Sequence, residues 1–126
     1  MNTKLVLSAS AVVLGIAGIA ASFMPHELLR AAGIAPAAPM PLLVQLLGAL
    51  WFAFAMVNWT ARGSLIGGIY NRPIAIGNLT HFVIGAFALG KDGTLMPVAI
   101  VYALFAIAFA MVFFRSPVSG AASPSS

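Results

Sequence analysis

The sequence predicts an all-α fold in which four membrane-spanning helices form a bundle with up-down topology. The 126-residue chain has a mean hydropathy of +1.07. Only 6% of its residues are charged, whereas a soluble domain carries about 25%. Its apolar residues gather into four runs, each close to the length of about 20 residues that crosses a bilayer as a helix. The predicted spans, which together make one membrane domain over residues 1–114, are residues 5–24, 42–59, 74–90 and 95–114.

The first run, residues 5–24, can be a membrane span or a cleaved secretory signal. The small residues at 20–22 would suit a cleavage site. Small residues also recur along this run at alternating spacings of three and four, which places them on one side of a helix. They are Ser8, Ala11, Gly15, Gly18 and Ser22. Because such a line lets a second helix approach closely, we predict an uncleaved span.

The connection from Pro25 to Pro41 holds four of the eight prolines, so its second half cannot be a regular helix. Residues 26–32 can form one short helix at the membrane surface. Gly33 would end it, because glycine readily adopts the left-handed conformation that closes many helices.

The second run, residues 42–59, contains Gln45, which we expect to face the other helices. Trp51 lies near the middle of the span, where its indole N–H needs a partner. Beyond the span, Arg62 and Arg72 bracket a loop. Two arginines beside a helix N-terminus can bind a phosphate or other anion. They can equally contact lipid headgroups and set the topology, which we favour.

The third run, residues 74–90, has the most polar interior. Asn78, His81 and Gly85 are spaced by three and four residues, so they share one side of a helix. A polar group that faces hydrocarbon is costly, and this side should therefore face protein. His81 can then carry a proton or bind a ligand, or it can join helices through hydrogen bonds, which we favour.

The fourth run, residues 95–114, should lie antiparallel to the third, because only the short turn 91–94 joins them. Tyr102 and His81 each lie within a few residues of the middle of their spans. A hydrogen bond between these two side chains is therefore a hypothesis. The tail, residues 115–126, is rich in serine, proline, glycine and alanine and is predicted to be disordered.

The charges predict an orientation and exclude some functions. Four spans place both termini on one side with four lysines or arginines and no acid, at residues 4, 62, 72 and 115. The positive-inside rule puts this side in the cytoplasm. Because the six basic residues are scattered, no nucleic-acid partner is predicted. The chain has no cysteine, which excludes thiol chemistry.

Several short motifs resemble a group of small, largely uncharacterised bacterial four-helix membrane proteins that is distantly similar to the DoxX-like families. The residues that carry the resemblance are Pro25–Leu29, Gly33, Gln45–Gly48, Asn58–Gly63, Arg72–Pro73, Asn78 and His81–Phe82. The resemblance covers about residues 5–114. It implies a four-helix bundle in the inner membrane, and it brings no catalytic signature.

Two functions follow from these patterns. The first, which we favour, is an accessory or structural membrane subunit within a larger complex or a homo-oligomer. The second is a binder or transporter of an apolar, lipid-like ligand. Its predicted site residues are His81, Asn78, Gln45, Tyr102 and Trp51. An enzyme is the weakest hypothesis, because general acid–base chemistry usually needs paired groups. No catalytic residue, metal ligand or cofactor is predicted.

Overall fold

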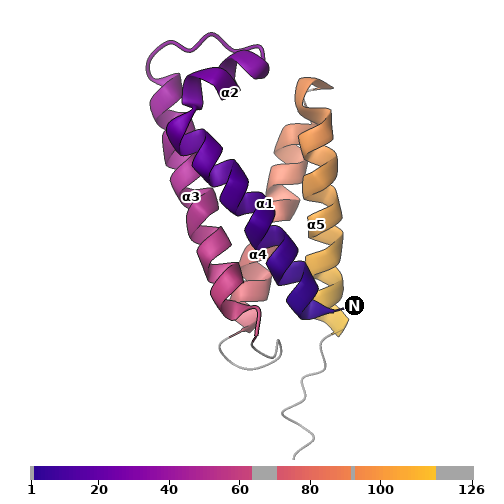
Figure 1. Cartoon of the computed structure of the whole chain (residues 1–126). Coiled ribbons are helices and arrows are strands. Elements are labelled where there is room, and N and C mark those ends of the chain that lie inside the picture. Colours follow the sequence, from indigo (N-terminus) through magenta and orange to yellow (C-terminus); the bar gives the residue numbers. More distant parts are fainter. Residues whose placement is uncertain (1, 64–70, 92, 116–126) are drawn as a thin grey trace, which may run out of the picture. The chain divides into compact units, whose positions relative to one another are not determined.

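The computed structural model describes residues 2–63, 71–91 and 93–115. In these ranges the regular elements are all helical (Figure 1). The four long helices begin and end within two residues of the predicted spans. The elements are α1 (Thr3–Phe23), α2 (Pro25–Ala31), α3 (Met40–Ala61), α4 (Arg72–Gly90), the 3-10 turn η1 (Gly93–Leu95) and α5 (Met96–Arg115).

Four helices of this structure are long and apolar enough to cross a membrane. The predicted all-α fold class is therefore confirmed, and the chain is a multi-pass membrane protein. Most of the tail predicted to be disordered, residues 116–126, lies outside the described residues. The chain divides into two compact units, one formed by Ser8–Thr60 and one by Met1–Leu7 with Ala61–Ser126. A single domain over residues 1–114 stays a prediction, and the two units are described separately below.

In the first unit, α1 and α3 run antiparallel and approach closely at two glycines. A Cβ atom added at Gly18 would lie 2.8 Å from the backbone nitrogen of Phe52 and 2.9 Å from the carbonyl oxygen of Gly48. A Cβ atom added at Gly48 would lie 2.9 Å from Ala21 Cβ. Neither position has room for a side chain. The small residues of α1 therefore serve packing within this unit, as expected for close helix contacts in membranes.

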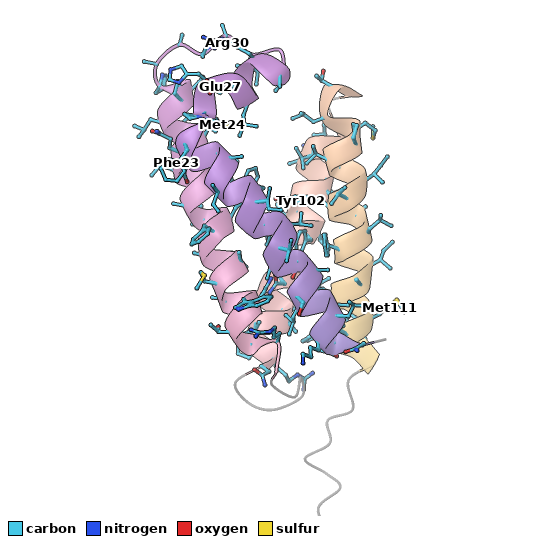
Figure 2. The ribbon with its side chains drawn as sticks, viewed as in Figure 1. Phe23, Met24, Glu27, Arg30, Tyr102 and Met111 are labelled. Carbon is cyan, nitrogen blue, oxygen red and sulfur yellow. The ribbon has the colours of Figure 1, made fainter. Side chains whose placement is uncertain are left out.

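The predicted surface helix is present as α2, whose first residue is Pro25. Gly33 has a φ of +77°, and the N–H of Ile34 donates a 2.8 Å hydrogen bond to the carbonyl of Leu29. This 6→1 bond beside a left-handed glycine is the Schellman motif that ends many helices. Glu27 and Arg30 are exposed on this short helix (Figure 2). The connection therefore presents polar side chains.

In the second unit, α4 and α5 form an antiparallel hairpin around Phe82. The Phe82 ring stacks on Phe105 and Phe109, with ring centroids 5.0 and 5.7 Å apart. The side chains of Phe82 and Phe109 are fully buried. Because aromatic pairs contribute beyond their buried area, this cluster holds the two helices in register. The prediction of antiparallel neighbours is confirmed.

Candidate functional site

His81 on α4 and Tyr102 on α5 form a hydrogen-bonded pair in the second unit. His81 Nε2 lies 3.1 Å from the Tyr102 hydroxyl oxygen, and the ring centroids are 5.3 Å apart. Tyr102 is buried and His81 is half-buried. Figure 2 labels Tyr102 on α5. The hydrogen bond predicted from the depth of the two residues is confirmed.

Gly85 allows this pair to form. A Cβ atom added at Gly85 would fall 2.5 Å from Cδ2 of Tyr102. Phe82 packs against the same ring, edge to face, with centroids 5.0 Å apart. Tyr102 is therefore fixed by two aromatic neighbours and a glycine backbone, and its hydroxyl position depends on all three.

Asn78 is fully buried, but its amide is directed back along its own helix. Asn78 Nδ2 donates a 2.9 Å hydrogen bond to the carbonyl of Ile74, one turn earlier. On the opposite side of α4, Ile76 and Phe87 are exposed, whereas Leu79 and Val83 are half-buried. The side of α4 that holds Asn78 and His81 thus combines an amide bonded within its own helix with a histidine that bonds to the neighbouring helix.

Gln45 and Trp51 lie in the first unit. Gln45 Nε2 donates a 3.4 Å hydrogen bond to the carbonyl of Ser22. Ser22 is in the last turn of α1, where carbonyl groups lack partners within their own helix. The Gln45 side chain thus contacts another helix, as expected, but it is exposed, because it lies in the second turn of α3 beside this helix end. Trp51 is half-buried. A site that joins either residue to His81 stays a prediction.

One buried polar pair was not among the predicted site residues. Asn58 Nδ2 donates a 2.9 Å hydrogen bond to Ser10 Oγ, and both side chains are fully buried. The signal was an asparagine within the apolar residues of the second span. The sequence does not identify its partner, because several small polar residues of the first span lie on neighbouring sides of the helix.

The two arginines of the predicted anion site belong to the second unit. The Arg72 guanidinium carbon lies 5.2 Å from the centroid of the Phe113 ring, a cation–π contact between α4 and α5. Arg72 is exposed and Arg62 is half-buried. Arg72 therefore combines an aromatic contact with access to the membrane surface. Anion binding by the two residues stays a prediction.

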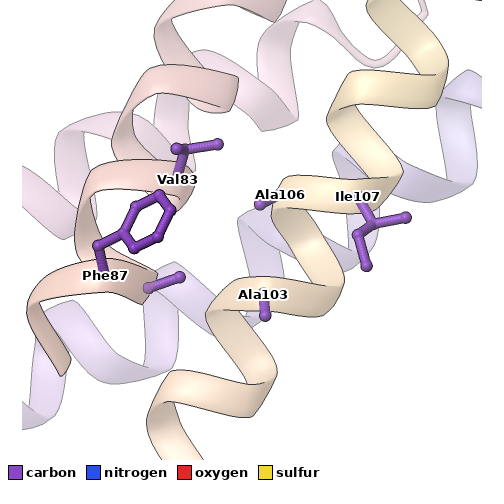
Figure 3. A pocket seen from close by; sticks show the side chains of 6 residues that line it. Val83, Phe87, Ala103, Ala106 and Ile107 are labelled. Carbon is purple, nitrogen blue, oxygen red and sulfur yellow. The ribbon is translucent and has the colours of Figure 1, made fainter. Parts of the chain in front are cut away.

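An apolar groove of about 400 Å³ runs between α4 and α5. Figure 3 shows its two walls, one from each helix. All of its lining side chains are hydrocarbon: Val83, Ala86, Phe87, Ala103, Ala106 and Ile107. Neither His81 nor Tyr102 is among them. The polar pair and the groove are therefore separate features of the hairpin.

The described residues hold no group of three or more histidine, cysteine, aspartate or glutamate side chains that could bind a metal ion. Comparison with known proteins gives no family model, no curated protein and no solved structure that matches the chain. The resemblance to the DoxX-like families thus stays a prediction, and the functional argument depends on the contacts described above.

Proposed function

We propose that the chain is an accessory or structural subunit of a bacterial-type inner membrane, where it acts through larger membrane proteins. The observation that supports this proposal is that the buried polar side chains in the described part of the chain are hydrogen-bonded within the protein. Among the described residues, every buried side-chain nitrogen or oxygen has a hydrogen-bond partner. Asn58 bonds to Ser10 and Asn78 to its own helix. Polar groups bonded in this way stabilise a scaffold, which is what an accessory subunit requires.

The His81–Tyr102 pair fits the same function. A hydrogen bond between neighbouring helices contributes about 0.6 kcal/mol on average in a membrane protein. Such a bond helps to fix two helices in register without any ligand. The DoxX-like resemblance, which brings no catalytic signature, accords with this proposal.

A second candidate function is binding of an apolar ligand beside His81. The observation that favours it is that the imidazole is only half-buried although it lies near the middle of α4. An apolar ligand with one polar group, such as a quinone, could meet the exposed part of the ring. Sites for small molecules combine mostly apolar walls with a few polar groups.

Gentle extraction from native membranes separates the two functions. The tagged full chain is purified in a mild detergent, and mass spectrometry identifies the proteins and small molecules that elute with it. The subunit function predicts a larger membrane protein at a constant ratio to the chain. A small molecule at a constant ratio, with no protein partner, would refute the subunit function and support ligand binding.

Two variants identify the part that His81 plays. Tyr102→Phe removes the hydrogen bond but keeps the imidazole, and His81→Ala removes both. The subunit function predicts that the protein partner stays bound to both variants, once each is shown to be folded. Ligand binding by the imidazole instead predicts that a small molecule is lost from His81→Ala and kept by Tyr102→Phe.

We further propose that both termini lie in the cytoplasm. Lys4, Arg62 and Arg72 support this orientation through the positive-inside rule. The natural chain has no cysteine, so single cysteines can report the sidedness. Gly63 and Gly93 suit this test because a Cβ atom added at either meets nothing within 4 Å. A maleimide that cannot cross membranes should label Gly93→Cys in intact cells and leave Gly63→Cys unlabelled. The reverse result would refute the orientation.

A further inference from the structure

The groove between α4 and α5 has the properties of a site for a hydrocarbon chain. Its volume of about 400 Å³ falls within the range of roughly 300–1,000 Å³ found for small-molecule sites. Ala103 and Ala106 contribute only methyl groups to its lining, and Phe87 and Ile107 flank it with exposed fractions of 74% and 58%. Because its lining offers no hydrogen-bonding side chain, the part of a ligand inside it must be apolar.

A lysine lies on the same side of α4, at the end of the span. Lys91 has helical backbone angles, with φ −70° and ψ −28°, so it continues the geometry of α4. Lys91 follows Phe87 by four residues, and Phe87 follows Val83 by four. Residues four apart lie on one side of a helix, separated by about 6 Å along its axis. Lys91 is exposed. The Lys91 side chain thus starts about one turn beyond the groove, in the direction of the membrane surface. The next residue in the sequence, Asp92, lies outside the described residues.

We propose that this groove binds one acyl chain of a membrane phospholipid, whose phosphate is bound by the Lys91 ammonium group. A phospholipid combines a negative charge at the membrane surface with an unbranched hydrocarbon chain directly beneath it. This order, a charge and then hydrocarbon, matches the order of Lys91, Phe87 and Val83 along α4. A partner's transmembrane helix could fill the apolar groove, but it would not in general supply a negative charge at Lys91. The site lies beyond the proposed subunit function and does not depend on it.

Native mass spectrometry of the purified full chain tests the site. The probe is dioleoyl phosphatidylglycerol, and dioleoylglycerol, which has the same chains without the phosphate, is the comparison lipid. We expect a one-to-one complex with the phospholipid. Ala103→Leu should fill the groove and lower the bound fraction at least five-fold. Phe87→Ala should remove one wall and lower it similarly. Lys91→Gln should reduce binding of the phospholipid and leave that of dioleoylglycerol unchanged.

Ala88→Leu is the matched control, because Ala88 is an exposed residue of α4 that does not line the groove. It should bind the phospholipid as the natural chain does. Far-UV circular dichroism verifies that each variant is folded. Unchanged binding by both Ala103→Leu and Phe87→Ala would overturn the proposal. So would a complex with a second 13.0 kDa chain, in place of lipid, that Ala103→Leu abolishes.

Discussion

The contact between α1 and α3 at Gly48 allows a quantitative test of the packing in the first unit. A methyl group added there would lie 2.8 Å from Ser22 Oγ, 2.9 Å from Ala21 Cβ and 2.9 Å from the carbonyl oxygen of Gly18. Ser22 can rotate away, but the other two atoms cannot move without their helix. Gly48→Ala therefore forces α1 and α3 apart.

The expected cost follows from two opposing effects. Overpacking a well-packed core costs about 1–3 kcal/mol. Alanine is better than glycine in a helix by roughly 0.8–1.0 kcal/mol, which offsets part of this cost. Gly90→Ala is the matched control, because a Cβ atom at Gly90 meets nothing within 4 Å. The free energy of unfolding should thus be about 1–3 kcal/mol lower for Gly48→Ala than for Gly90→Ala.

Titration with sodium dodecyl sulfate in mild detergent micelles measures this difference. The two tryptophans, Trp51 and Trp59, both lie on α3, so their fluorescence follows the helix whose packing is changed. Circular dichroism gives an independent signal for total helix. If Gly48→Ala and Gly90→Ala unfold at the same detergent composition, the close contact between α1 and α3 is wrong.

Three further experiments test the other contacts by the same titration. Tyr102→Phe, which removes the hydrogen bond to His81, should lower the free energy of unfolding by about 0.6 kcal/mol, and a loss above about 2 kcal/mol would contradict a simple bond. A double-mutant cycle of Asn58→Ala and Ser10→Ala should give a coupling energy of about 0.6–1.7 kcal/mol, whereas zero coupling would exclude their hydrogen bond. Phe82→Ala should cost about 3–5 kcal/mol, as for other large-to-small changes at buried aromatics, and a cost below 1 kcal/mol would exclude a central packing role.

The positions of the helices could be predicted because hydrocarbon thickness fixes the length of a span. Proline and charged residues then mark where each span ends, as Pro73 does in the first turn of α4. Depth also predicted the His81–Tyr102 contact. A short turn joins their two helices, so residues at similar distances from that turn lie at the same level.

The depth of a residue in the membrane does not fix the rotation of its helix about the helix axis. The sequence therefore left open which side chains of two helices meet. Ser10 is fully buried although it lies outside the predicted line of small residues on α1, which shows that α3 contacts a wider part of the helix. Gln45 was predicted to face the other helices, and its amide does contact the end of α1, although the side chain is exposed. Both outcomes depend on atoms of another helix. The spacing of residues along one span gives no information about those atoms.

The local hydrogen bond of Asn78 has a consequence for biogenesis. During translation each span leaves the translocon before all of its later neighbours exist, and an asparagine without a partner at bilayer depth would oppose its partition into lipid. Because the Asn78 amide donates to Ile74 of the same helix, part of this cost is met as soon as α4 coils. Asn58, in contrast, donates to Ser10 on another helix. The Asn58–Ser10 bond can therefore form only when α1 and α3 are both in the bilayer, whereas the Asn78–Ile74 bond forms within α4 alone.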